Sequence, residues 1–369
     1  MERRATREIK VGGVAIGGGA PVSVQTMCNR DPHDEAALAA QVSSCAELGA
    51  DIVRLTVPDV EAAAVLGRVR RATGVPLVAD IHFDWRCALA AVEAGADALR
   101  LNPGNIGGPE RVREVARAAR AKGVPIRIGV NGGSLEKDIA AKYGGAEAGV
   151  KFAAPPEALV ESAMRHVALL EAEGFRDIAI SVKASDVPRT LAAYRLLSGR
   201  CDYPLHLGVT EAGTFVPGTV RSSVALGVLL SEGIGDTIRV SLTDEPEREV
   251  QVGVEILRSL GMRDPGPHVT SCPTCCRTKA DVFRVAAEVQ DRMERLYRKV
   301  GARAGRSFPH VAVMGCVVNG PGEAKAADIA LCGGDGVFLV YEGGRLVETV
   351  PEDKAADAVA GRVTGMLAV

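Results

Sequence analysis

The first 245 residues alternate between short apolar runs and longer segments that are rich in Ala, Leu and Glu. The short runs have the length and composition of β-strands. The segments between them, such as "DEAALAAQVSSCAELG", place apolar residues at helical spacing, and several end in Gly. This alternation predicts repeated strand–helix units and a parallel sheet. Eight such strands are expected, at residues 22–27, 51–57, 76–83, 98–105, 125–131, 177–185, 204–213 and 237–244.

The number of strands and the length of the repeat favour an α/β protein built on a (β/α)8 TIM barrel. An open, doubly wound sheet is the alternative, and it is less favoured because no glycine-rich dinucleotide fingerprint follows the first strand. The Pro- and Gly-rich stretch "MRDPGPHVTS" is typical of a linker, and a helical segment, further β-type runs and a last helix follow it. We therefore expect a barrel domain over residues 1–262 and a small α/β domain over residues 263–369.

The composition narrows the possible partners. Apolar residues make up 47% of the 369 residues, and the formal net charge is −2, which argues against general binding to nucleic acid or to membrane surfaces. No apolar run has the length of a signal peptide core or of a membrane span. We expect a cytoplasmic protein, in which clustered cysteines bind metal or react rather than form disulfides.

Four arginines, Arg54, Arg100, Arg127 and Arg239, each lie between two apolar neighbours inside a β-type run. Side chains alternate between the two faces of a strand, so each arginine points away from its neighbours. Each arginine could pair with an acidic residue or reach the rim. Alternatively, the four converge inside the barrel, where guanidinium groups are costly to bury unless an anion binds among them. Their planar shape suits phosphate oxygens, so we predict a small phosphorylated ligand. Other polar residues expected at this site are His82, Asn102, Asn131, Lys183, Ser185, His206 and Ser241.

A single carboxylate, Glu211 in "VTEAG", follows the seventh predicted strand and opposes this positive charge. It is interpreted either as a counter-charge to the arginines or as a general acid or base.

Three cysteines of the second domain are candidates for metal ligands. Cys272 and Cys275 form a C-x-x-C pair, and Cys316 follows in "VMGCVVNGPGEAKAAD" with Glu323 close behind it. A structural zinc site is one interpretation, although it usually needs a second cysteine pair or two histidines. Three thiolates also suffice to hold a [4Fe-4S] cluster, and an oxygen ligand such as Glu323 would bind the remaining iron more weakly. Cys276 is then surplus to the ligand set.

The five remaining cysteines are scattered along the chain and are expected to pack as small apolar residues. They are Cys28, Cys45, Cys87, Cys201 and Cys332.

These motifs together resemble the bacterial, two-domain family of 4-hydroxy-3-methylbut-2-enyl diphosphate synthases of the non-mevalonate isoprenoid pathway. The resemblance covers nearly the whole chain. It is carried by "PLVADIHFD", "LRLNPGNIG", "PIRIGVN", "GSLEKD", "SVKASD", "LHLGVTEAG", "LLSEGIGDTIRVSL", "CPTC" and "GCVVNGPGEA".

The resemblance implies a substrate, a reaction and a cofactor. The substrate is 2-C-methyl-D-erythritol 2,4-cyclodiphosphate, whose ring is opened by two-electron reduction with loss of a hydroxyl as water. The resemblance also implies that reduced flavodoxin or ferredoxin supplies the electrons and that the chain forms a head-to-tail homodimer. Glu211 corresponds to a proposed proton donor of the family. The implied ligands of a [4Fe-4S] cluster are Cys272, Cys275, Cys316 and Glu323. The implied diphosphate contacts are Arg54, Arg100, Arg127, Lys183, Arg239 and Ser241.

The chain departs from the family pattern at three positions. Cys28 and Arg30 stand where small hydroxyl residues are common, and Cys276 stands where Gly or Ser is usual. Two other classes of function are kept open. One is a zinc-stabilised barrel that isomerises or cleaves phosphosugars without redox chemistry, and the other is an iron–sulfur sensor without turnover.

Overall fold

The computed structural model describes residues 2–144, 153–300, 308–316, 322 and 325–367. The chain divides into two compact units, Met1–Arg263 and Asp264–Val369, and each unit is described by itself. This division lies one residue beyond the end predicted for the barrel domain.

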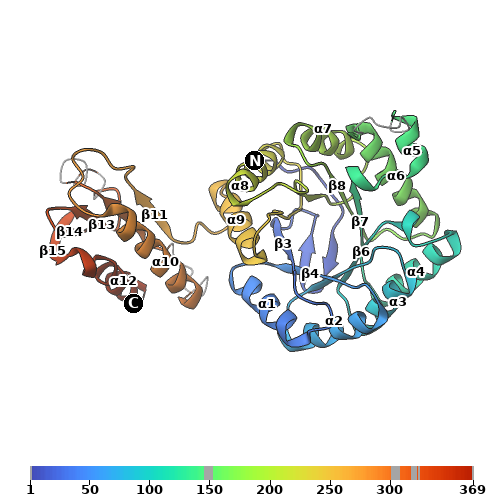
Figure 1. Cartoon of the computed structure of the whole chain (residues 1–369), viewed down its shortest axis with the longest axis horizontal. Coiled ribbons are helices and arrows are strands. Elements are labelled where there is room, and N and C mark those ends of the chain that lie inside the picture. The colour runs from blue at the N-terminus through green and yellow to red at the C-terminus, as the bar shows by residue number, and fades with distance from the viewer. Residues whose placement is uncertain (1, 145–152, 301–307, 317–321, 323–324, 368–369) are drawn as a thin grey trace. The chain divides into compact units, whose positions relative to one another are not determined.

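The first unit contains the eight-stranded parallel barrel that the alternating pattern predicts (Figure 1). Its strands lie in the order β8-β7-β6-β5-β4-β3-β10-β9, and a parallel bridge between Ile180 and Leu205 joins the two ends of this sheet. The prediction of a TIM barrel is therefore confirmed. The strands are β3 (Ser23–Met27), β4 (Ile52–Thr56), β5 (Leu77–Asp80), β6 (Ala98–Leu101), β7 (Ile126–Asn131), β8 (Ile178–Lys183), β9 (His206–Leu207) and β10 (Thr237–Ile238).

Helices surround the barrel, and capping residues mark where several of them begin and end. Asp59 and Asp186 accept hydrogen bonds from backbone N–H groups at the starts of α2 and α7. Gly74 and Gly95 end α2 and α3 in the left-handed conformation that glycine adopts easily. The helices are α1 (Glu35–Glu47), α2 (Val60–Thr73), α3 (Trp85–Ala94), α4 (Pro109–Lys122), α5 (Lys137–Lys142), α6 (Pro156–Ala172), α7 (Val187–Ser198), α8 (Phe215–Ser231) and α9 (Pro246–Ser259), with short 3-10 turns η1 (Pro103–Asn105) and η2 (Gly132–Ser134).

The main core lies between the outer face of the barrel and its helices, and it is made largely of Ala, Val, Leu and Ile. Each fully buried Val, Leu or Ile side chain contributes roughly 1.5–3 kcal/mol to folding. As expected, Cys28, Cys45 and Cys87 are buried in this core and Cys201 is half-buried against it, while Cys332 is buried in an apolar cluster of the second unit.

A short antiparallel hairpin, β1 (Ile9–Val11) and β2 (Val14–Ile16), precedes the barrel. The apolar side chains of its strands pack against residues at the amino ends of the barrel strands, among them Ile52, Val78 and Ala98. The hairpin covers this end of the barrel, and the sequence analysis did not anticipate it.

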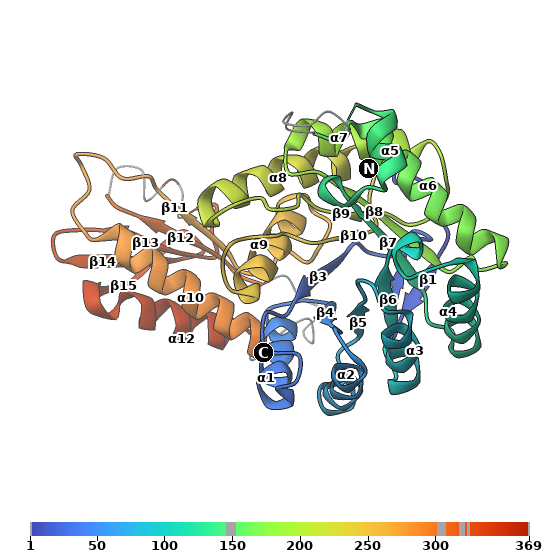
Figure 2. The ribbon, with the colours of Figure 1, turned by 45° about the vertical axis from the view of Figure 1, so that its right-hand side comes forward.

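The second unit is a five-stranded sheet in the order β11-β12-β13-β14-β15. The first three strands are parallel, and the last two pair antiparallel. Helices α10 (Val282–Val300) and α12 (Ala355–Leu367) share one apolar core with the sheet (Figure 2). The strands are β11 (His268–Ser271), β12 (His310–Met314), β13 (Ile329–Gly333), β14 (Val337–Glu342) and β15 (Arg345–Pro351), and a turn η4 (Glu352–Lys354) precedes α12.

Candidate active site

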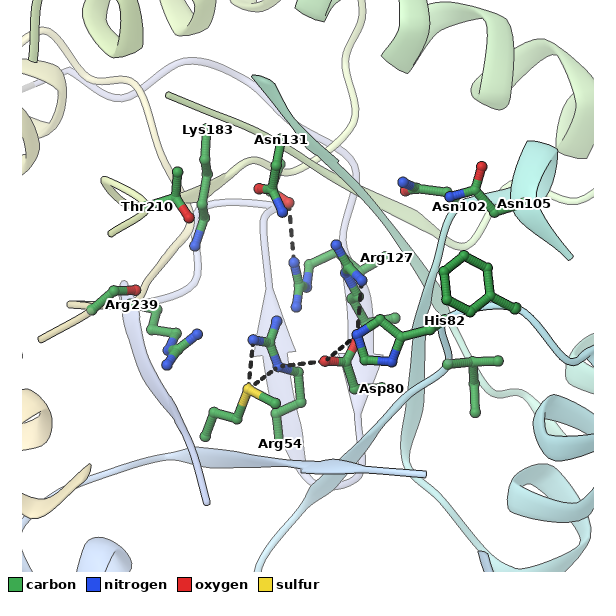
Figure 3. Close-up of a pocket in the computed structure, with 16 residues that line it drawn as sticks. Arg54, Asp80, His82, Asn102, Asn105, Arg127, Asn131, Lys183, Thr210 and Arg239 are labelled. Carbon is green, nitrogen blue, oxygen red and sulfur yellow. Dashed lines mark hydrogen bonds and ion pairs between the residues drawn. The ribbon is translucent and has the colours of Figure 1, made fainter. Parts of the chain in front are cut away.

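A cavity of about 350 Å³ lies at the carboxyl ends of the barrel strands, and we call it the mouth cavity (Figure 3). This is the end of a TIM barrel at which ligands bind. Most of the side chains around the cavity are charged or polar. They are Met27, Arg54, Asp80, Ile81, His82, Phe83, Arg100, Asn102, Asn105, Arg127, Asn131, Ser181, Lys183, Thr210, Arg239 and Ser241.

The strand register explains why the basic side chains converge. Arg100 on β6 is the register partner of Asp80 on β5 and of Arg127 on β7. Lys183 on β8 is the register partner of Asn131 on β7. Register partners of parallel strands point to the same face of the sheet, and because these residues line the mouth cavity, that face is the barrel interior. The alternation in the sequence left the choice of face open, and the lining of the mouth cavity decides it.

Asp80 lies among the basic groups and interacts with three of them. One of its carboxylate oxygens is 3.2 Å from Arg100 Nη1, and the other is 3.6 Å from Arg54 Nε and 3.9 Å from His82 Nε2. Burial alone would raise the pKa of Asp80, but the positive charges of Arg54 and Arg100 outweigh it and lower that pKa below its usual value. Asp80 is therefore a buried carboxylate that holds these side chains in place.

Positive charge exceeds negative charge around the mouth cavity. A second buried carboxylate, Glu249, lies 3.4 Å from Arg239 and accepts hydrogen bonds from Thr26 and from the backbone of Leu242. Asp80 and Glu249 face five basic groups: Arg54, Arg100, Arg127, Lys183 and Arg239.

Burial has a large effect on these cations. It lowers the pKa of Arg54 to about 10, although Asp80 opposes the shift. It also lowers the pKa of Lys183 well below its usual value, and the positive charge of Arg127 adds to this effect. A bound anion would relieve both the desolvation and the mutual repulsion of these groups.

Two glycines make room for the basic side chains. A Cβ atom on Gly129 of β7 would lie 2.9 Å from Arg100 Nη2 and closer still to Nε of the same residue. A Cβ atom on Gly208 would lie 2.7 Å from Lys183 Nζ and 2.6 Å from the carbonyl oxygen of Arg239. Neither glycine was predicted to matter for the site, although a glycine inside a β-type run can mark a close approach. Neither Asp80 nor Glu249 was among the residues predicted for this site.

Nine of the eleven residues predicted to bind substrate line the mouth cavity, and two do not. Ser185 is exposed beyond the end of β8. His206 is fully buried and lines a separate, smaller cavity deeper in the barrel. Direct contact between His206 and a ligand in the mouth cavity is therefore not supported, because its ring lies at a lower level of the barrel interior. The nine residues are Arg54, His82, Arg100, Asn102, Arg127, Asn131, Lys183, Arg239 and Ser241.

Glu211 follows β9 next to Thr210, which lines the cavity, but Glu211 itself is not among the described residues that do so. Its side chain is exposed, and its φ of 52° places a non-glycine residue in the left-handed region. Such a conformation costs on the order of 1–3 kcal/mol and occurs most often at functional sites.

The cysteines of the second unit lie near the carboxyl ends of adjacent strands. Residue 272 directly follows β11, and residue 316 lies two residues beyond β12, the parallel neighbour of β11. The N–H of Gly315 donates a hydrogen bond to Cys272 Sγ at 3.2 Å. Cys275 and Cys276 are exposed in the loop that follows, in which Thr274 has a φ of 67°. Glu323 lies outside the described residues, so the structure does not place this predicted ligand.

The two candidate metal groups require different distances between the ligand sulfurs. Among the described residues, no three His, Cys, Asp or Glu side chains lie close enough together to hold one metal ion. A single zinc ion needs ligand sulfurs within about 4 Å of one another, because each Zn–S bond is about 2.3 Å long. The thiolates around a four-iron cluster bind different irons and lie farther apart. Cys272 and Cys316 lie at the carboxyl ends of neighbouring strands, and the N–H···S hydrogen bond at Cys272 suits a thiolate that binds an iron–sulfur group.

The fold and the two sites define a class: a TIM-barrel protein with a cationic cavity at the barrel mouth, joined to a small α/β domain that carries three candidate ligand cysteines. The match with known families is specific. Residues 6–254 match the GcpE TIM-barrel domain, and residues 268–364 match the GcpE protein C-terminal domain. The chain belongs to the GcpE family.

Curated relatives cover nearly the whole chain. A protein of Maridesulfovibrio salexigens is 52% identical over 354 residues, which are 96% of this chain and 94% of the relative. A protein of Geobacter sulfurreducens is 52% identical over 363 residues, which are 98% of each chain. Both carry the name 4-hydroxy-3-methylbut-2-en-1-yl diphosphate synthase (flavodoxin).

The solved structures that were compared support the barrel alone. A type I 3-dehydroquinate dehydratase of Clostridium difficile matches with a TM-score of 0.50 and 15% identity, over 69% of this chain and 98% of that chain. In the part of the chain that the structure describes, no helix has both the length and the apolar character needed to span a membrane.

Proposed function

We propose that this chain reductively opens and dehydroxylates 2-C-methyl-D-erythritol 2,4-cyclodiphosphate to give 4-hydroxy-3-methylbut-2-enyl diphosphate. The observation that carries this proposal is the group of five basic side chains around one cavity, faced by two buried carboxylates. A small cyclic diphosphate supplies the negative charge that this group lacks. Relatives that are 52% identical carry the name of the same synthase.

The basic groups have two tasks in this reaction. They bind the substrate through charge-assisted hydrogen bonds, each contributing on the order of 1.5–3 kcal/mol. They also stabilise the negative charge that grows on the phosphate oxygen when the bridging C–O bond breaks. The hydrogen bonds of Arg100 to Asp80 and to the carbonyl oxygen of Gly129 fix its position before the substrate arrives. This preorganisation favours the transition state because little rearrangement is needed during the reaction.

Glu211 is the candidate proton donor for the departing hydroxyl group. Its strained backbone and its position next to Thr210 at the end of β9 support this role. The Glu211→Gln variant should bind substrate normally and leave the metal centre intact, while turnover falls by roughly 100-fold or more, the usual scale for loss of a general acid. Turnover equal to that of the original protein would exclude Glu211 from this role.

The family and the thiols of the second unit support an iron–sulfur cofactor, and we propose a [4Fe-4S] cluster held by Cys272, Cys275, Cys316 and Glu323. When bound, this cluster would supply electrons to the substrate one at a time. Loss of iron and sulfide in the Cys316→Ser variant, but not in Cys276→Ser, would agree with this ligand set. Equal loss in both variants would contradict the surplus role of Cys276.

Flavodoxin appears in the names of the curated relatives and is the proposed electron donor, with ferredoxin as the alternative. A head-to-tail homodimer, in which each cluster domain meets the partner's barrel, and a cytoplasmic location stay predictions. The zinc-dependent alternative is not favoured, because the relatives are named as synthases of the reductive reaction.

The proposal is tested by product analysis under anaerobic conditions. Iron-loaded protein is incubated with the cyclodiphosphate and reduced flavodoxin, and the products are identified by mass spectrometry. We expect the allylic diphosphate from the original protein and none from Arg127→Gln. The matched control is Arg68→Gln, which changes an exposed arginine of α2 and should remain active. Recovery of unchanged cyclodiphosphate from fully loaded protein, or conversion without a reductant, would overturn the proposal.

A further inference from the structure

A second, much smaller cavity of about 20 Å³ lies deeper in the barrel, and we call it the inner cavity. Apolar side chains of the β1–β2 hairpin and of residues near the amino ends of the barrel strands form part of its wall. Four polar side chains complete the wall: Gln25, Arg127, His206 and Thr237. Arg127 also lines the mouth cavity, so its side chain separates the two spaces.

Several polar atoms of this wall have no protein partner. The two ring nitrogens of His206, the hydroxyl of Thr237 and Nε of Arg127 are buried and make no hydrogen bond with any residue that the structure describes. His206 and Thr237 are register partners on β9 and β10, so their side chains point to the same side. Each buried polar group without a partner costs on the order of 1–3 kcal/mol. Such atoms around one small space indicate a ligand that can both donate and accept hydrogen bonds.

We propose that the inner cavity binds one water molecule, held by His206, Thr237 and Arg127. Its volume of about 20 Å³ suits one water molecule, which needs at least roughly 10–15 Å³ on this measure, and excludes larger ligands. Water accepts a hydrogen bond from Nε of Arg127 and donates to the imidazole and to the hydroxyl. A halide ion could accept from Arg127 but could not donate to His206.

The ionisation of His206 agrees with this arrangement. Burial lowers the pKa of His206 well below its usual value, and the positive charge of Lys183 adds to the shift. Titratable and charged groups from the neighbouring strands, Lys183, Arg127, Arg54 and Arg239, all act in the same direction. His206 is therefore neutral near pH 7 and has one nitrogen that accepts a hydrogen bond.

The water molecule gives His206 and Thr237 a positioning role. Arg127 otherwise donates to Ser181 Oγ at 3.0 Å and, at a long 3.5 Å, to Gln25 Oε1. The water molecule is a third hydrogen-bond partner, on Nε of Arg127, and it fixes the guanidinium plane from the side opposite the mouth cavity. Binding of a phosphate group by Arg127 thus depends on two residues that never touch the ligand. The positioning role of His206 and Thr237 rests on the proposed anion site, whereas the water site does not depend on it.

The water site is tested by a high-resolution crystal structure of the full chain, together with a bromide soak. We expect one density peak within hydrogen-bond distance of His206 and Thr237, and no anomalous signal from bromide at that position. An empty inner cavity, or a bromide ion in it, would overturn the assignment. Nitrogen NMR of His206 should show a neutral ring at pH 7, and a ring that is protonated there would also contradict the assignment.

The positioning role is tested by calorimetric binding of inorganic pyrophosphate, which needs neither the cluster nor turnover. Thr237→Val keeps the shape of the side chain but removes the hydroxyl, and it should weaken pyrophosphate binding by roughly 3- to 10-fold, the scale of one hydrogen bond. Thr237→Ser should restore the original affinity. The control Thr219→Val removes another hydroxyl without a hydrogen-bond partner among the described residues, on α8, and should change nothing. Equal affinities of Thr237→Val and the original protein would overturn the positioning role.

Discussion

Gly129→Ala is the sharpest test of how the barrel positions its basic groups. The backbone of Gly129 lies in β7 and is not in the left-handed region, so alanine fits the local conformation. The added methyl group, however, would lie 2.9 Å from Arg100 Nη2 and 3.0 Å from its Cζ, closer than Cβ atoms approach other groups. Arg100 must move and lose its hydrogen bonds to the Gly129 carbonyl and to Asp80, at 3.0 and 3.2 Å.

The expected loss is that of one charge-assisted contact to the substrate, on the order of 1.5–3 kcal/mol or roughly 10- to 150-fold in affinity. The assay is calorimetric binding of the cyclodiphosphate, with thermal unfolding measured in parallel. Gly227→Ala on α8 is the matched control, because no atom lies within 4 Å of the added Cβ, and it should leave affinity unchanged. Tight binding by a folded Gly129→Ala protein would refute the argument that this glycine positions Arg100.

Three further predictions follow from the charges and from the two units. Asp80→Asn should destabilise the protein by about 3–5 kcal/mol, because buried Arg54 and Arg100 lose their carboxylate, and added pyrophosphate should stabilise this variant more than the original. The pKa of Asp80 is lowered in the folded state, so its contribution is present above about pH 4 and is lost as the pH falls through the folded pKa. Denaturant titrations should therefore show that the free energies of unfolding of the original protein and of Asp80→Asn become more similar below about pH 4. A difference that stays constant with pH would contradict this link between the ionisation of Asp80 and stability. Finally, if active sites are shared between chains, mixing inactive Arg239→Ala and Cys316→Ser proteins should restore up to one intact site per mixed dimer. If mass spectrometry verifies subunit exchange and no activity is recovered, each active site is formed within one chain.

The sequence was most informative where a local pattern has one structural solution. Arginines between apolar neighbours, as at Arg54 and Arg127, had to face opposite to those neighbours, and the burial of the neighbours in the outer core turns the arginines into the barrel. Repeated around a barrel, this rule brings them into one cavity. The same reasoning placed His206 inside the barrel correctly but at the wrong level, because the height of a residue depends on the stagger between strands, which a single sequence does not encode.

Other features depend on contacts between distant segments. Gly129 and Gly208 gain their significance only from the side chains that approach them. The proximity of Cys272 to Gly315 follows from the parallel pairing of β11 and β12, which lie about forty residues apart. The β1–β2 hairpin was predictable in principle, since "IKVGGVAI" has apolar runs on either side of Gly-Gly, a favoured two-residue turn.

The most direct test of the account is the number of electrons consumed per product molecule. Anaerobic, iron-loaded protein is given a measured amount of reduced flavodoxin and excess cyclodiphosphate, and the allylic diphosphate is quantified. We expect two electrons to be consumed for each molecule formed, and no product once the reductant is exhausted. Product that accumulates without consumption of electrons would contradict the account.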